Sequence, residues 1–161
     1  MVYARPATAR PRFSSLIARA EVLEGRVVSV AEGDTITLLD GNQQQHKIRL
    51  AGIDAPEKEQ PFGQRSKQHL AKLVFGKDAK ADCYKIDRYG RDVCNVYVNG
   101  QDVGLAQLDA GLAWWYRKYA HEQHPKDRID YEAAEDRAAA DRVGLWQDAN
   151  PVPPWEWRRG H

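Results

Sequence analysis

The sequence lacks long apolar runs, internal repeats and a strong excess of charge of either sign. Nowhere do as many as about eighteen apolar residues follow one another, so no membrane-spanning helix is predicted. The formal net charge is +1, and any nucleic-acid binding must therefore come from the local arrangement of charges rather than from bulk charge. The 161 residues, 42% of them apolar and 29% charged, are enough for one globular domain with a substantial core.

Cysteine is equally scarce, because Cys83 and Cys94 are the only two. They flank the segment 87–90, and if this segment is a tight turn, the two residues oppose each other across a hairpin. A disulfide in an oxidising compartment fits these positions. Two small buried residues on a strand face fit them equally well. Two isolated thiols lack the paired spacing of zinc ligands, so a metal–cysteine site is not supported.

The first residues carry a weak export-like pattern. Arg5, Arg10 and Arg12 precede the segment 13–20, whose end is loosely similar to a small-residue cleavage site. The apolar part is short and contains Arg19, so we interpret it as a poor signal peptide. We expect a flexible N-terminal arm over residues 1–24. The stump of a longer export segment is the alternative interpretation.

Alternation of β-branched and polar residues predicts five strands, and helical spacing predicts about three helices. The strands are expected at 25–32, 35–39, a third that runs to Ile53 after the turn at 40–42, 79–86 and 91–98; the helices are expected at 63–75, 102–109 and 126–142. One helix is inserted between the third and fourth strands, and the others follow the strands. This order predicts an α+β fold, a five-stranded Greek-key β-barrel of the OB type with about three packed helices.

Aromatic residues gather near the C-terminus. We expect residues 148–161 to form an extended, proline-rich tail whose tryptophans pack back on a domain of residues 25–147. Upstream, Trp114 and Trp115 are interpreted as core anchors. Tyr116 is left open between a core position and a platform on which bases stack.

Charged side chains that suit phosphate chemistry lie in the stretch 47–57 and just upstream of it. The stretch begins like a strand and contains Arg49, Asp54 and Glu57, and Asp34 precedes it in a Gly-Asp-Thr segment. Carboxylate oxygens suit a hard cation, a guanidinium suits phosphate, and a spare carboxylate suits proton transfer. Singly, each residue also fits a turn, a strand surface or a helix start. Together, at this spacing, they predict a site.

Three segments resemble the signature segments of the staphylococcal nuclease (thermonuclease) family, in the same order and with similar gaps. They are Glu32-Gly33-Asp34-Thr35, residues 49–57 and Asp87-Arg88-Tyr89-Gly90-Arg91. The resemblance covers residues 25–147, and the Pro-Trp tail is similar to the endings of bacterial members. It implies an OB barrel with packed helices. It also implies a calcium-dependent phosphodiesterase that hydrolyses DNA and RNA and leaves 3′-phosphate and 5′-hydroxyl ends.

The resemblance implies roles for individual residues. The implied catalytic residues are Arg49 and Arg91, which bind phosphate, and Glu57, which activates water; the implied calcium ligands are Asp34, Asp54 and the backbone carbonyl of Ala55; the implied substrate-binding residues are Arg88, Tyr89 and Tyr116. Two positions depart from the type member of the family. Glu32 stands in place of an Asp and Ala55 in place of a Thr, so we expect a different calcium affinity and the same reaction class.

The competing hypothesis is a non-catalytic barrel of the same fold that binds nucleic acid or protein. Such a module has no need of a water-activating carboxylate, so Glu57 favours the enzyme. A zinc enzyme or zinc-stabilised module is disfavoured because oxygen donors favour calcium. We expect a monomer that acts on single-stranded DNA and RNA without membrane contact. By the family resemblance, we expect it to be secreted or periplasmic.

Overall fold

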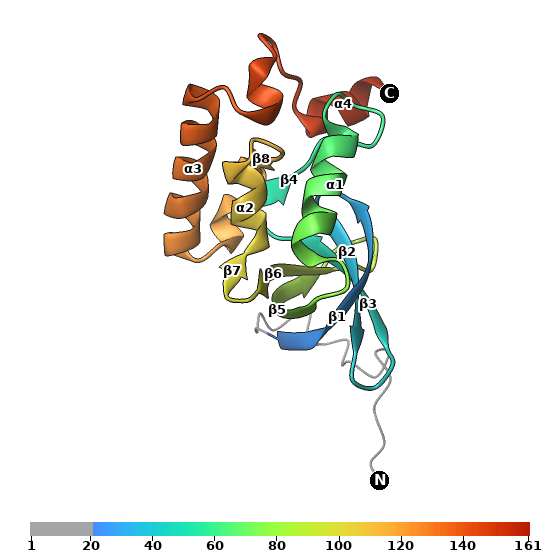
Figure 1. Cartoon of the computed structure of the whole chain (residues 1–161). Coiled ribbons are helices and arrows are strands. Elements are labelled where there is room, and N and C mark those ends of the chain that lie inside the picture. The colour runs from blue at the N-terminus through green and yellow to red at the C-terminus, as the bar shows by residue number, and fades with distance from the viewer. Residues whose placement is uncertain (1–20) are drawn as a thin grey trace.

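A computed structural model describes residues 21–161, whose strands and helices are arranged around one β-barrel (Figure 1). Residues 1–20, with the export-like segment and most of the predicted arm, lie outside the described residues. The first strand begins at Glu21 rather than at Gly25. The end of the segment predicted as an arm is therefore part of the sheet.

Five strands close into the barrel. They are β1 (Glu21–Glu32), β2 (Thr35–Asp40), β3 (Gln45–Leu50), β5 (Asp78–Ile86) and β6 (Asp92–Val98). The order is β3-β2-β1-β5-β6, and β6 pairs with β3 to close the circle. The β3–β6 pair is parallel, whereas the other four pairs are antiparallel. The predicted fold class, a five-stranded OB-type barrel with added helices, is confirmed.

β1 is long enough to pair with two neighbours because it bends between them. Its first half pairs with β5 and its second half with β2, and the register with β2 shifts twice over residues 27–32. Such bulges curve a strand and allow a sheet to close. At Gly25, which pairs with both neighbours, a Cβ atom would lie 2.1 Å from the backbone oxygen of Leu39. This position therefore needs a residue without a side chain.

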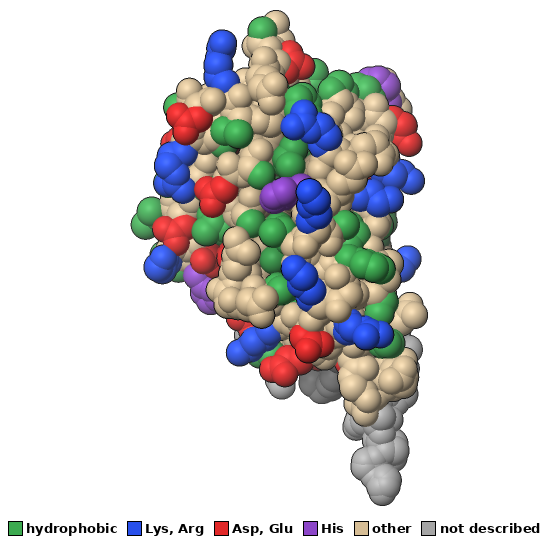
Figure 2. Space-filling view, in the orientation of Figure 1, with side chains coloured by type: hydrophobic (Ala, Val, Ile, Leu, Met, Phe, Trp, Pro, Cys, Tyr) green, Lys and Arg blue, Asp and Glu red, His purple; other side chains and the backbone are tan. Residues whose placement is uncertain are grey.

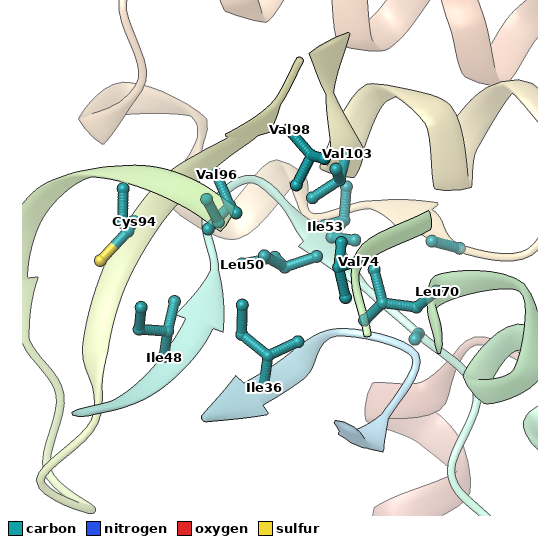
Figure 3. Packing of buried hydrophobic residues seen from close by; sticks show 14 of the residues in the cluster. Ile36, Ile48, Leu50, Ile53, Leu70, Val74, Cys94, Val96, Val98 and Val103 are labelled. Carbon is teal, nitrogen blue, oxygen red and sulfur yellow. The ribbon is translucent and has the colours of Figure 1, made fainter. Parts of the chain in front are cut away.

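The inward-facing side chains of the strands fill the barrel. Figure 3 shows Ile36 of β2 beside Ile48 and Leu50 of β3, and all three are buried. Leu70 and Val74 belong to the same cluster and extend it to the helix that packs on the barrel (Figure 3). Apolar side chains that alternate along the strands and recur at 3.6-residue spacing along the helix thus pack into one core.

The hairpin formed by β5 and β6 carries the two cysteines. Cys83 and Cys94 occupy directly paired positions and form a disulfide, which decides between the two interpretations that the sequence left open. The predicted tight turn joins the strands. Asp87 accepts a backbone hydrogen bond from Gly90 and donates one to Arg91, and Gly90 has a φ of +81°. A positive φ at this position favours glycine.

Three helices lie at the predicted places: α1 (Gly63–Val74) and α2 (Val103–Asp109) pack on the barrel, and α3 (Pro125–Ala140) packs on α2. Asp102 caps α2, because its Oδ1 accepts a hydrogen bond of 3.1 Å from the Leu105 N–H. α2 lies between α1 and α3 (Figure 1). The buried face of α3 includes Tyr131, and the opposite face is exposed.

The remaining elements are short: β4 (Ile53–Asp54), β7 (Gln101–Asp102), β8 (Trp114–Trp115), the 3-10 helices η3 (Arg117–Glu122) and η4 (Gly144–Gln147), and α4 (Pro154–Gly160). Two predictions were wrong here. The third predicted strand is broken into β3 and β4 by a turn at Ala51 and Gly52, because Gly52 has a φ of +80°. The tail is not extended throughout, since Pro154, whose fixed φ suits a first helical turn, begins α4.

The surface mixes charges of both signs. Figure 2 shows Lys and Arg interspersed with Asp and Glu on the face that carries α1, α2 and α3. On α3, Lys126 pairs with Asp130 at 2.6 Å and i,i+4 spacing, as is common on the solvated face of a helix. Within residues 21–161, no helix combines the length and apolarity needed to cross a membrane.

Candidate active site

A cavity of about 810 Å³ gathers almost all of the predicted site residues. It is lined by Asp34, Arg49, Asp54, Glu57, Arg88, Tyr89, Arg91 and Tyr116, and further by residues of η3 and α4. The remaining predicted residue, Ala55, is buried and bonded to Asp34 through its backbone N–H. Segments that are far apart in the sequence therefore meet around one hollow.

Asp34 is held in a single orientation at the turn between β1 and β2. Its Oδ2 accepts a hydrogen bond of 2.8 Å from the Ala55 N–H, and its Oδ1 accepts one of 2.9 Å from the hydroxyl of Thr35. Its backbone carbonyl accepts a 2.9 Å bond from the Leu50 N–H. The carboxylate is buried but hydrogen-bonded, which is the condition under which a buried charge is tolerated.

Asp54 is placed by β4, which pairs with β8 so that Ile53 faces Trp115 and Asp54 faces Trp114. The residue is almost completely buried, with 1% of its surface exposed. Burial raises the pKa of Asp54 above its usual range, whereas hydrogen bonds from Arg158 and the charge of Arg49 act in the opposite direction. Cations beside this carboxylate are therefore needed to keep it ionised.

Arg49 in β3 lies between the two aspartates. Its Nη2 is 3.1 Å from Asp54 Oδ1 and 3.5 Å from Asp34 Oδ2. Its Nη1 donates to the backbone carbonyls of Leu50, at 3.0 Å, and Ile53, at 2.7 Å. Burial lowers the pKa of Arg49, but the charges of Asp34 and Asp54 outweigh it and raise that pKa. The guanidinium is thus charged and fixed at the centre of the site.

Glu57 and Glu32 add two more carboxylates. The backbone N–H of Glu57 donates to Gln60 Oε1 at 3.0 Å, and its side chain is 25% exposed at the cavity. Burial and the charges of Asp34 and Glu57 raise the pKa of Glu32 to about 7. Four carboxylates therefore repel one another here, and the arrangement favours any additional cation.

The turn between β5 and β6 contributes the second basic group. Arg91 Nε donates to Asp87 Oδ2 at 2.8 Å, and the Arg91 guanidinium lies 5.3 Å from the ring centre of Tyr89. Arg88 donates to the Tyr89 hydroxyl at 2.7 Å, and Tyr89 is 67% exposed. The structure brings these three residues to the cavity. In the described part of the chain, the carboxylate paired with Arg91 is Asp87, not a predicted metal ligand.

Tyr116, whose role the sequence left open, stands at the edge of the cavity. Its ring stacks on that of Trp155 with a centroid distance of 5.5 Å and an angle of 4°, and it meets Tyr119 edge-on at 5.0 Å. The guanidinium carbon of Arg49 lies 6.0 Å from the Tyr116 ring centre. Burial and the charge of Asp54 raise the pKa of Tyr116, so the phenol stays neutral. The neighbouring Trp115 is a buried core anchor, as predicted.

Arg158 is a site residue that the sequence did not reveal. Its Nη2 is 2.8 Å from Asp54 Oδ2, and its Nη1 is 3.2 Å from Asp54 Oδ1 and 2.7 Å from Glu57 Oε2. The only sequence signal was Pro154, a residue common at the first position of a helix, followed by residues without a helix breaker. Nothing in the sequence indicated which carboxylate this helix would meet.

The donor set fits a hard cation. Asp34 and Asp54 direct carboxylate oxygens to the same guanidinium nitrogen, and oxygen is the donor that calcium prefers. Over residues 21–161, no three His, Cys, Asp or Glu side chains are grouped so as to hold one ion. A cation bound by these two aspartates would therefore be completed by backbone carbonyl and water. The guanidinium of Arg158 already places positive charge on this carboxylate cluster.

Comparison with known proteins finds a match to one family model, described as "Staphylococcal nuclease homologue", over residues 47–148. An uncharacterized endonuclease of Haemophilus influenzae is 43% identical over 83% of this chain and 72% of its own length. A micrococcal nuclease of Shigella flexneri is 41% identical over 84% of this chain and 80% of its own length. The staphylococcal-like nuclease CAN1 of Arabidopsis thaliana is 43% identical over 70% of this chain and 33% of its own length.

Proposed function

This chain belongs to the staphylococcal nuclease family, and on that premise we propose that it is a calcium-dependent nuclease. It hydrolyses phosphodiester bonds of DNA and RNA and leaves 3′-phosphate and 5′-hydroxyl ends. The observation that carries the proposal is the meeting of Asp34, Arg49, Asp54 and Glu57 in one cavity. A barrel that only binds nucleic acid gains nothing from carboxylates placed where they would repel phosphate.

The two arginines supply the positive charge that the reaction needs. Hydrolysis of a phosphodiester adds negative charge at phosphorus, and fixed donors aimed at that charge are the largest contribution to catalysis. Arg49 is immobilised by two carbonyls and two carboxylates, so its position costs no reorganisation when substrate binds. Arg91 reaches the cavity from the end of the β5–β6 turn, held by Asp87. Guanidinium groups can give phosphate two parallel hydrogen bonds, which Lys cannot.

Glu57 acts as the general base. Its side chain is partly exposed to the cavity, whereas Asp34 and Asp54 are buried, so Glu57 is the carboxylate that water can reach. It orients the attacking water and accepts its proton. Asp34, Asp54 and the Ala55 carbonyl would hold calcium, which would supply Lewis acidity to the reaction.

The substrate is single-stranded nucleic acid. Tyr89 is exposed at the cavity, where an unpaired base can stack on its ring, and Tyr116 also lines the cavity. The lining also carries Lys47, Lys85 and Lys118. Because base stacking hides the faces of bases in a duplex, this arrangement favours an unpaired strand. We propose that the enzyme acts as a monomer, which a light-scattering measurement of its mass tests.

We propose a secreted or periplasmic location. The support is the disulfide between Cys83 and Cys94, since disulfides persist in oxidising compartments and are rare where thiols are kept reduced. Fractionation of cells that express the whole chain tests this, and recovery of the protein with reduced cysteines from the cytosol would contradict it.

The nuclease proposal is tested by cleavage of defined DNA and RNA oligonucleotides with calcium, with chelator, and with other divalent metals. We expect cleavage with calcium, none with chelator, and product ends that a polynucleotide kinase can label at the 5′-hydroxyl without prior dephosphorylation. Retained binding of oligonucleotide with no cleavage by any divalent metal would overturn the proposal in favour of a binding barrel.

A further inference from the structure

The C-terminal helix α4 delivers a guanidinium to the carboxylates of the site. Arg158 donates hydrogen bonds to Asp54 from both terminal nitrogens: Nη2 lies 2.8 Å from Oδ2 and Nη1 lies 3.2 Å from Oδ1. Its Nη1 also lies 2.7 Å from Glu57 Oε2. Such a two-pronged contact is the strong form of an arginine–carboxylate pair. One side chain thus holds both a predicted calcium ligand and the predicted general base.

The path of the tail explains how Arg158 reaches this place. Gln60 accepts from the Glu57 N–H through Oε1 and donates through Nε2 to the carbonyl of Val152, so it joins the site loop to the tail. Trp155 stacks on Tyr116 and meets Trp114 edge-on at 5.6 Å. These contacts anchor the beginning of α4 independently of Arg158. The position of its guanidinium therefore follows from packing as well as from charge.

Arg158 forms hydrogen bonds to both carboxylate oxygens of Asp54. Oδ2 accepts from Arg158, and Oδ1 accepts from both Arg158 and Arg49. A divalent cation at Asp54 would need one of the same oxygens and would lie next to a like charge. Asp54 therefore cannot bind the cation and keep both hydrogen bonds to Arg158 at the same time.

The two side chains of the Arg158–Asp54 ion pair differ in exposure, so the pair can separate by movement of Arg158 alone. The Arg158 side chain is 40% exposed, whereas that of Asp54 is 1% exposed. Because the Arg158 side chain already reaches the surface, water can solvate its guanidinium when it leaves Asp54, which offsets part of the lost pairing. The buried aspartate, in contrast, needs a cation at all times. When another cation replaces Arg158, the Asp54 carboxylate keeps a positive charge beside it and the Arg158 guanidinium is solvated by water.

We propose that Arg158 is a further residue of the active site that competes with the divalent cation for Asp54 and thereby sets the cation affinity. The inference rests on the proposed calcium-dependent function. It also assigns a role to the tail beyond packing, because α4 lies outside residues 47–148 that match the family model. Removal of the guanidinium strengthens cation binding, whereas removal of a site ligand weakens it.

The experiment compares calcium binding by the wild type, R158Q and the control R159Q, using calorimetry at fixed ionic strength. Arg159 is the adjacent exposed residue, so its substitution makes the same change of charge on the same helix. If Arg158 leaves Asp54 in about one molecule in ten, R158Q binds calcium about tenfold more tightly than the wild type. R159Q is expected to stay within about twofold of the wild type.

Hydrogen exchange in the wild type provides a second measurement that needs no variant. We expect the amides of residues 155–160 to exchange faster with saturating calcium than without it, because α4 loses an anchor. Equal or weaker calcium binding by R158Q, or no change of α4 exchange with calcium, overturns the inference while calcium-dependent cleavage by the wild type persists. Absence of calcium binding and of cleavage in the wild type overturns the proposed function and the inference together.

Discussion

The carboxylate of Asp34 accepts a hydrogen bond of 2.8 Å from the backbone N–H of Ala55, across 21 positions of sequence. This bond ties the turn after β1 to the loop after β4, which are the two segments that carry the predicted calcium ligands. It fixes Asp34 without using its other oxygen, which accepts from Thr35. The site is therefore preorganised by its own backbone.

Asp34→Asn is expected to weaken calcium binding about tenfold or more. The amide oxygen of Asn can still accept from Ala55, so the fold and the turn stay intact while the charge is lost. Calorimetric titration with calcium measures the effect. Asp78→Asn, an exposed position at the start of β5, is the control with the same change of charge. Unchanged affinity in Asp34→Asn would remove Asp34 from the set of ligands.

Arg91→Lys and Arg88→Gln are expected to affect different kinetic constants. Arg91 is assigned to the phosphate in the transition state, so Lys, which lacks the planar fork, lowers kcat about 10²-fold with little change of KM. Arg88 is exposed beside Tyr89 and is assigned to substrate binding, so Gln mainly raises KM. Steady-state kinetics on one oligonucleotide separates the two effects. A raised KM for Arg91→Lys with unchanged kcat would refute its catalytic role.

The Cys83–Cys94 disulfide is expected to contribute about 2–4 kcal/mol to the free energy of unfolding. It joins neighbouring strands of the barrel and neither cysteine lines the cavity, so its loss lowers stability more than it changes the reaction. Thermal unfolding with and without reductant measures this contribution. The double substitution Cys83→Ala with Cys94→Ala, which reductant cannot affect, is the control. An unfolding temperature of the wild type that is indifferent to reductant would contradict the prediction.

Asp87 is expected to make stability depend on pH in the acidic range. Burial raises its pKa, but hydrogen bonds from the backbone and side chain of Arg91 and from the Tyr89 N–H outweigh burial and lower the pKa below the usual value. A lowered pKa in the folded state means that the ionised group stabilises the fold. This contribution is complete above the unfolded pKa, about 4, and is lost as the pH falls through the folded pKa.

The measurement is the difference in free energy of unfolding between the wild type and Asp87→Asn. At pH 7 we expect the wild type to be more stable by about 1 kcal/mol, the scale of a charge-assisted hydrogen bond at a partly exposed site. Below about pH 3 we expect the difference to become small. A difference that is constant from pH 7 to pH 3 would show that the charge of Asp87 does not stabilise the turn.

Most of the fold could be predicted because its signals are local. Glycine and asparagine turns separate short alternating strands, and Asp102 marks the start of α2 by its capping side chain. The break between β3 and β4 could not be predicted by alternation alone. It depends on Gly52, whose positive φ and close approach to Gln123 are set by tertiary packing.

The site was predicted from residue types and the family resemblance, and the structure brings those residues to one cavity. Their chemical roles stay predictions. Arg158 was missed because its partners, Asp54 and Glu57, lie 104 and 101 positions away, and charge alone does not specify a partner. The prediction of an extended tail was wrong, because a proline fits the first turn of a helix as well as an extended segment, and Pro154 begins α4.

The central claim, that this is a nuclease whose general base is Glu57, is tested most directly by Glu57→Gln. Single-turnover cleavage and equilibrium binding of one single-stranded oligonucleotide are measured with calcium, and Glu59→Gln, an exposed neighbour, is the control. We predict that Glu57→Gln slows cleavage by about 10²–10⁴-fold while oligonucleotide binding changes no more than a few-fold, and that Glu59→Gln cleaves like the wild type. Cleavage by Glu57→Gln at the wild-type rate would contradict the account.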